Sequence, residues 1–306
     1  MSGEDFDSRA SRLCNWGRWG PDDELGTVNF ITDRKVAEAA ALVRRGQIFA
    51  LGIPLDESGP QQGRSGRFNP IHFMTALPAE HVLPDGTGTG DDVIVLPTQS
   101  ATQWDSLAHK SHRGMLYGGR PHEMVAGDGA GVNSIQAVSG RMVTRGVLAD
   151  MPGFRGAGAL VPGEEITASD LSAVLRHQGT DAGEGDILLV RTGHMDRCRR
   201  DRWRGYYDAA PGLGVDTLDW IHERRLAGVA ADTGAVEVRP SRVPGVRSPF
   251  HVLALVYMGL LIGEIFDLEA LSAACRADGV YDFQLAGPPL PIGGGVASPV
   301  NPYAIR

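Results

Sequence analysis

Residues 98–119 read TQSATQWDSLAHKSHRGMLYGG, and they follow an apolar run at Val93–Leu96. Four apolar, mostly β-branched residues bounded by acidic residues and a proline predict a short, buried β-strand. Beyond this strand Gln99, Gln103 and Asp105 occupy alternating positions, so an extended chain would direct their side chains to one face. We therefore expect the functional site to be built around this segment.

The same segment resembles the signature of a known enzyme family. The cyclase family of metal-dependent hydrolases, which includes kynurenine formamidase, isatin hydrolase and trans-dienelactone hydrolase, carries the pattern His-x-Gly-Thr-His-x-Asp-x-Pro-x-His. The corresponding stretch here reads QSATQWDSLAH, in which Thr102, Asp105 and His109 match the pattern. Gln99 and Gln103 stand where the family has two histidines. Because an amide is a much weaker metal ligand than an imidazole, the resemblance implies one metal ion here rather than two.

A second group of candidate ligands lies in the stretch FHVLALVYMGLLIGEIFDLEAL, where His251 and Glu264 flank an apolar segment. An acid in such surroundings is costly unless it is paired or bound to a cation. In the resembled family a histidine and an acid at a similar spacing complete the metal shell. The resemblance thus implies that Asp105, His251 and Glu264 hold one divalent ion, manganese or zinc, with Gln103 as a weak ligand. An ion-paired core is the alternative.

The resemblance implies a hydrolase that acts on a C–N or C–O bond of a small cyclic amide, lactone or N-acyl substrate. Water activated by the metal would attack the carbonyl, with His109 as the general base and Asp105 beside it. Two alternatives remain open. One is a metal-independent biosynthetic cyclase or lyase that uses Asp105 and His109, and the other is a non-catalytic protein that binds a small molecule.

Five residues are expected to contact the substrate, each with a structural alternative. Gln99 and Trp104 belong to the signature segment, and Tyr117 could orient a carbonyl or belong to the core. Asp232, in a segment that resembles the family's Asp-Asn-x-x-x-Glu and also contains Glu237, could shape the pocket or cap a turn. Trp19 could cover the pocket, or it could belong to a terminal arm that packs on the body.

Apolar periodicity and capping residues predict alternating helices and strands through the rest of the chain. Strands joined to helices at glycines favour a mixed α/β core, and the resemblance implies the swivelling β/β/α fold of the cyclase and kynurenine formamidase type. We expect one catalytic domain over residues 1–306, with an N-terminal arm at about 1–31 and a Gly/Pro-rich C-terminal segment at about 284–306. The expected helices cover residues 33–43, 169–177, 215–225 and 268–276, and the expected strands 48–51, 147–149, 187–191 and 227–231.

Three further expectations concern charged or flexible segments. Asp186 and Arg191 are expected to form a structural ion pair. Residues 193–207, rich in arginine and aromatic residues, are either a solvated helix face or a basic lid over an anionic or aromatic substrate. The long loop at 57–70 is typical of a lid or an oligomer contact.

Composition narrows the choice of partners. A net charge of −8 without a Lys/Arg-rich run argues against nucleic acid and favours a small-molecule substrate. The N-terminus has no apolar core, and no apolar run reaches the roughly 18 residues of a membrane span. Three widely spaced cysteines suit the reduced cytoplasm. The resemblance also implies a homodimer or homotetramer.

Overall fold

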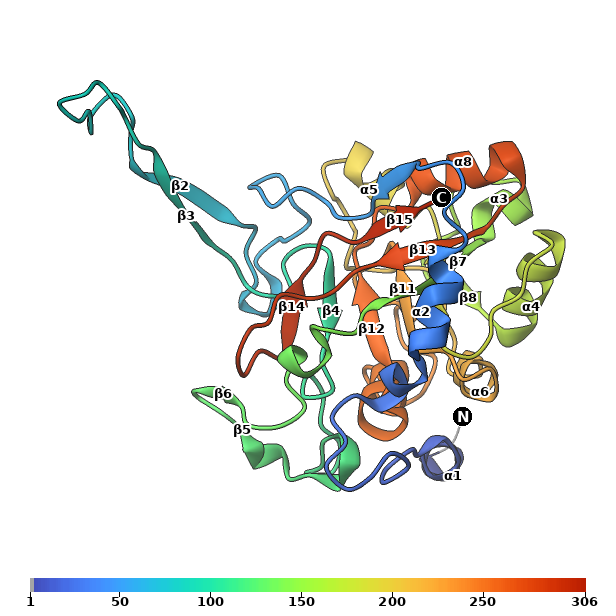
Figure 1. The fold of residues 1–306 in the computed structure, drawn as a ribbon. Coiled ribbons are helices and arrows are strands. Elements are labelled where there is room, and N and C mark those ends of the chain that lie inside the picture. The colour runs from blue at the N-terminus through green and yellow to red at the C-terminus, as the bar shows by residue number, and fades with distance from the viewer. Residues whose placement is uncertain (1–2) are drawn as a thin grey trace.

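A nine-stranded mixed sheet, in the order β1-β15-β13-β7-β9-β11-β12-β4-β14, organises the computed structural model, which describes residues 3–306 (Figure 1). Four neighbouring strands at its centre run parallel. These are β7 (Val143–Asp150), β9 (Ile187–Arg191), β11 (Gly228–Ala231) and β12 (Leu261–Glu264). Parallel strands are usually buried on both faces, and the residues of β9, β11 and β12 are all buried.

Antiparallel strands complete the sheet at both ends. One end is formed by β13 (Asp282–Ala286), β15 (Tyr303–Ile305) and β1 (Ile48–Ala50), and the other by β4 (Gln103–Asp105) and β14 (Ala297–Pro299). The sheet thereby places β4 directly beside β12. Four shorter strands lie outside it: β5 (Val125–Ala126), β6 (Gly129–Ala130), β8 (Glu165–Ile166) and β10 (Gly212–Leu213).

Helices cover both faces of the sheet. Alternate residues of each strand point to opposite sides, so apolar side chains on each face pack against their own set of helices. Leu188 and Val190 of β9 lie in one core cluster with residues of α4 and α6, whereas Ile187 and Leu189 lie in a second cluster with residues of α8. The helices are α1 (Gly3–Leu13), α2 (Asp33–Ala40), α3 (Met151–Arg155), α4 (Ala168–His177), α5 (His194–Arg200), α6 (Thr217–Glu223), α7 (Pro249–His251), which continues into a π-helical segment at Val252–Met258, and α8 (Glu269–Asp278). Short 3-10 helices lie at Gly26–Phe30, Arg64–Gly66, Tyr117–Gly119, His122–Met124 and Ile135–Val138.

Local signals predicted most element positions well. The side chain of Thr32 accepts from the backbone N–H of Lys35 and caps α2, which ends at Ala40, earlier than predicted. Thr167 and Asp170 form a capping box at the start of α4, and β9 has the predicted bounds. No helix within residues 3–306 is both long and apolar enough to cross a membrane.

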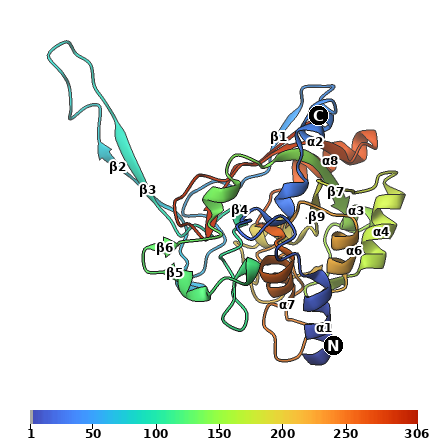
Figure 2. The ribbon, with the colours of Figure 1, turned by 60° about the horizontal axis from the view of Figure 1, so that its bottom comes forward.

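The predicted strand at Val93–Leu96 forms, but the prediction that it is buried is wrong. It is β3 (Asp91–Val95), which pairs only with β2 (Ile71–Ala76) in a hairpin that projects away from the body (Figures 1 and 2). We call this hairpin the β2–β3 arm. Every residue of β3 is exposed. A β-branched run favours an extended chain, but its burial depends on neighbours that periodicity does not report.

Two other expectations about charged segments are resolved by the structure. The predicted Asp186–Arg191 pair is wrong, because the register of β7 and β9 places Asp150 opposite Arg191, and the two form an ion pair of 2.8 Å. In the segment at 193–207, Trp203 and Tyr206 are buried in a small core cluster. Burial of both rings differs from the expected solvated helix face and from a lid, and these two side chains stabilise the body.

Candidate metal centre and active site

Along β4, the side chains of the signature residues alternate between the two faces of the sheet. Gln103 and Asp105 point to one side and are completely buried. Trp104 points to the other, where its indole donates to the carbonyl of Gly287 and packs edge-on against Phe266. The expectation that Trp104 contacts substrate is therefore wrong, since its side chain is 0% exposed in the core on the opposite face of the strand.

Pairing of β4 with β12 brings Glu264 opposite Gln103. Gln103 Nε2 donates to Glu264 Oε2 at 3.0 Å. His251 enters from α7, with its Nε2 3.1 Å from Glu264 Oε1 and 3.8 Å from Asp105 Oδ2. One ligand atom from each of Asp105, His251 and Glu264 lies within 4.8 Å of the others, and all three residues are buried. The three predicted metal ligands thus meet at one point.

Glu237, to which sequence reasoning gave no role, orients the imidazole. Its Oε1 forms a short hydrogen bond with His251 Nδ1, and its Oε2 accepts from the backbone N–H of Phe250 at 3.1 Å. A proton held on Nδ1 leaves Nε2 free to bind a metal, which is the usual arrangement of a metal-binding histidine and an outer carboxylate. The only signal in the sequence was the position of Glu237 in the segment that resembles Asp-Asn-x-x-x-Glu.

The donor set fits one divalent ion. Asp105 Oδ2 and Gln103 Oε1 are buried without a hydrogen-bond partner among the described residues. Buried polar atoms nearly always have a partner, so two such atoms beside a carboxylate and an imidazole indicate a place for a cation. Two carboxylates and one imidazole are ligands that zinc and manganese both accept.

Residues 40–238, more than half of the chain, match the protein family described as "Putative cyclase". The chain belongs to this cyclase family. A crystal structure described as a novel cyclase is 38% identical, with a TM-score of 0.88 over 97% of this chain and 99% of that one. A search of curated proteins found no match.

Two isatin hydrolases share the fold of this cyclase-family chain at lower identity. Isatin hydrolase A from Ralstonia solanacearum is 18% identical over 84% of this chain and 91% of its own, with a TM-score of 0.61. An isatin hydrolase bound to the product analogue thioisatinate is 15% identical over 87% and 94%, with a TM-score of 0.64. The predicted mixed-sheet α/β fold of the cyclase type is confirmed.

In this cyclase-family chain, the candidate metal ligands have shifted pKa values. Burial and the charge of Glu264 raise the pKa of Asp105 to about 7. Burial disfavours the charged form of His251, but Glu237 and Glu264 outweigh it and raise the pKa of His251 to about 9. Burial also opposes ionisation of Glu264, yet the hydrogen bond from His251 and its charge lower the pKa of Glu264 overall. A metal ion bound at this site would therefore compete with protons on Asp105 and His251.

His109 lies beside the cluster without joining it. Its Nε2 is 3.7 Å from Asp105 Oδ2, which is too long for a hydrogen bond, and its side chain is partly accessible. Burial and the charges of Lys110 and His251 lower the pKa of His109 to about 3. The imidazole is therefore neutral at physiological pH, and it is a weaker base than an ordinary histidine.

The other four expected substrate contacts, Tyr117, Asp232, Trp19 and Gln99, have partners within the protein. The Tyr117 hydroxyl donates to Asp23 at 2.9 Å, and its ring is buried. Both carboxylate oxygens of Asp232 accept from Thr192 and Gly193, just after the neighbouring strand β9, so Asp232 ties two strand ends together.

The ring of Trp19 packs edge-on against Phe30, as in the alternative of a packed terminal arm. Gln99 precedes β4 and is half-buried, and its side-chain oxygen accepts from Thr98. Among the described residues, neither Trp19 nor Gln99 is hydrogen bonded to the three metal-site residues.

Proposed function

We propose that this chain is a metal-dependent hydrolase that opens a C–N or C–O bond in a small cyclic amide, lactone or N-acyl substrate. The observation that supports this most strongly is the buried cluster of Asp105, His251 and Glu264 with its unpaired oxygen. The isatin hydrolases that share the fold are consistent with this chemistry.

Asp105, His251 and Glu264 would hold the ion, manganese or zinc, and Gln103 would offer its unpaired Oε1 as a weak ligand. When bound, such an ion lowers the pKa of its water towards about 7 and polarises a carbonyl. Gln103 Nε2 holds Glu264 in place, while Glu237 fixes the tautomer of His251. His109 accepts a proton at its neutral imidazole and returns it to the leaving group.

Metal analysis combined with hydrolysis assays tests this proposal. Protein purified without chelator is expected to contain a stoichiometric divalent ion and to hydrolyse cyclic amides or lactones. Dialysis against a chelator should abolish turnover, and separate reconstitution with manganese and zinc should identify the productive ion. Full turnover by metal-free protein would favour the metal-independent cyclase or lyase, whereas binding without turnover would favour a non-catalytic relative.

We also propose that the protein is a homodimer or homotetramer in which the β2–β3 arm packs against a second copy. Ile71 pairs with Val95 and Phe73 with Val93, so the four side chains share one face of the hairpin. Each is 39–52% exposed. An isolated two-stranded hairpin is marginally stable in water, and an exposed apolar face of this kind marks an interface.

Size-exclusion chromatography with light scattering tests the role of the arm. The double variant Phe73→Ser, Val95→Ser should shift the protein towards the monomer. The matched control is Met74→Ser, which alters the other face of the same strand. A wild-type protein that is monomeric at micromolar concentration would contradict this proposal.

A further inference from the structure

A cavity of about 360 Å³ lies beside the candidate metal centre. Lys110, which follows His109 in the chain, lines it, and so does Ser248, which precedes the α7 turn that carries His251. Arg239, also in the cavity wall, reaches Glu237, the carboxylate that orients His251, at 4.0 Å. The cavity is therefore close enough to the metal centre for one small molecule to occupy both.

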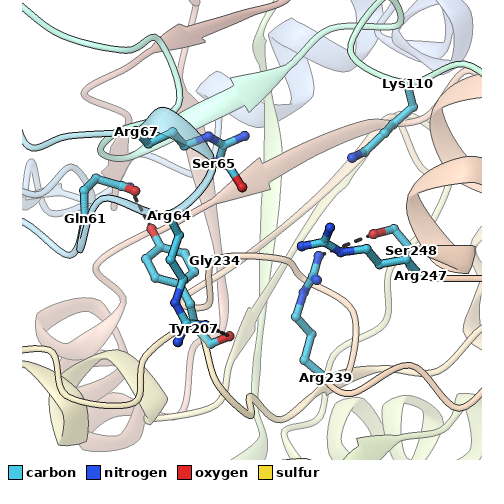
Figure 3. Close-up of a pocket in the computed structure, with 10 residues that line it drawn as sticks. All are labelled: Gln61, Arg64, Ser65, Arg67, Lys110, Tyr207, Gly234, Arg239, Arg247 and Ser248. Carbon is cyan, nitrogen blue, oxygen red and sulfur yellow. Dashed lines mark hydrogen bonds between the residues drawn. The ribbon is translucent and has the colours of Figure 1, made fainter.

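Positive charge dominates this cavity. Arg67, Lys110, Arg239 and Arg247 come from three separate segments and extend towards its middle (Figure 3). Among residues 3–306, no aspartate or glutamate lines it. Such a concentration of cations is unexpected in a chain with a net charge of −8.

These cations are poorly neutralised by the protein itself. Among the described side chains, Arg67, Lys110 and Arg247 have no carboxylate oxygen within 4.0 Å, and Arg239 only reaches Glu237 at 4.0 Å. By contrast, Arg64 at the cavity rim pairs with Asp208.

Burial makes the missing counter-charge more significant. Arg67, Lys110 and Arg239 are partly buried, so they have lost part of their hydration without gaining an ion pair. Mutual repulsion adds to this cost. An anion in the cavity would relieve both, and the planar guanidinium groups match the oxygens of a carboxylate or phosphate.

A neutral donor also lines the cavity. The hydroxyl oxygen of Tyr207 accepts from Gln61 Nε2 at 2.7 Å, which leaves its own proton available. Burial raises the pKa of Tyr207, so the hydroxyl stays protonated and can donate to an oxygen of a ligand.

We propose that this cavity binds an oxyanion of the substrate, a carboxylate or phosphate group separate from the bond that is cleaved. The assignment to the substrate rests on the proposed function, whereas the binding of an anion does not. With the anion held by Arg67, Arg239 and Arg247, the opposite end of a small molecule reaches the metal centre. The cavity thus selects anionic amides or lactones over neutral ones and orients them for attack.

Isothermal titration calorimetry with simple probes tests the proposal on the full-length protein. Succinate and inorganic phosphate represent the two anions, and succinamide is the neutral counterpart of succinate. We expect wild-type protein to bind at least one anion at least about tenfold more tightly than succinamide, and less tightly as salt increases. The preferred anion identifies the substrate class.

Charge-removing variants locate the site. Arg247→Gln and Arg67→Gln should each weaken binding of the preferred anion at least about tenfold, because each removes a charge-assisted hydrogen bond. Arg204→Gln removes the same charge from a side chain that is exposed outside the cavity and should change the affinity by less than about twofold. Circular dichroism confirms that each variant is folded. The proposal would be overturned if the wild type bound succinamide as tightly as the anions. It would also be overturned if both cavity variants kept the wild-type affinity for the preferred anion.

A final experiment separates this inference from the proposed function, since a carboxylate could also bind the metal. The titration is repeated with Glu264→Gln and with wild-type protein from which metal has been removed by chelation and dialysis. If anion binding survives in the variant and in the metal-free protein, the anion lies in the cavity. If binding is lost in both proteins, the anion binds the metal and the inference is refuted. Absence of hydrolysis with anion binding intact would reject only the proposed function.

Discussion

Replacement of Glu237 by glutamine tests how the metal centre is oriented. The variant Glu237→Gln keeps one acceptor oxygen in place of two, so it can accept from Phe250 N–H or from His251 Nδ1 but not from both, and it removes the negative charge. Both partners are buried, so no water compensates for the lost charge. We therefore expect the fold to be retained and the metal affinity to fall.

The expected loss of metal affinity follows from the weaker support that residue 237 then gives to His251. Removal of an outer carboxylate from a metal-binding histidine typically lowers metal affinity 10- to 100-fold, which corresponds to about 1.4 to 2.7 kcal/mol. The charge of Glu237 is also the leading influence that raises the pKa of His251. In the variant that pKa should fall, which returns a part of the lost affinity at neutral pH, so we expect the lower end of the range.

Competition with a fluorescent chelator measures the affinity of the wild type and the variant for zinc and manganese. Glu269→Gln is the matched control, because it removes a carboxylate that pairs with Arg191 away from the metal centre. The control should retain wild-type affinity. If Glu237→Gln is folded and binds metal as tightly as the wild type, Glu237 does not orient the ligand and the account of the site is wrong.

Three further predictions concern protons, catalysis and stability. In metal-free protein, Asp105 and His251 have raised pKa values and hold protons that the unfolded chain releases at lower pH, so stability should fall from about pH 6 to about pH 8. Added metal should raise the melting temperature more at the higher pH, and a shift independent of pH would contradict this. His109→Ala should lower kcat about 10²- to 10⁴-fold with unchanged metal content, whereas an unchanged kcat would exclude His109 as the base. Thr167→Ala removes the cap of α4 and should cost about 1 kcal/mol of unfolding free energy, as measured by chemical denaturation, with no loss of metal.

The cluster of Asp105, His251 and Glu264 could be predicted from the sequence because the segments that carry it resemble those of the cyclase family. Asp105 matches the family's signature, and Glu264 is an acid in an apolar stretch at a similar spacing from His251 to that of the family's acid. The pairing of β4 with β12 then brings them together. Metal binding itself stays a prediction.

The remaining features depend on tertiary contacts that local patterns do not encode. Glu237 reaches His251 across a long loop, and nothing in its own neighbourhood indicates that partner. The cavity cations come from three separate segments, which include Arg67 and Arg247. No run of basic residues in the sequence therefore indicates that they lie together. Pairing of Arg191 with Asp150 is decided by strand register.

The central claim is that Asp105, His251 and Glu264 bind the divalent ion on which hydrolysis depends. Anomalous X-ray diffraction from crystals of the active protein, recorded on both sides of the absorption edge of manganese or zinc, tests it most directly. We predict a single strong anomalous peak between these three side chains, and its loss together with turnover in Glu264→Gln. Fully active crystals without a peak at this position would contradict the claim.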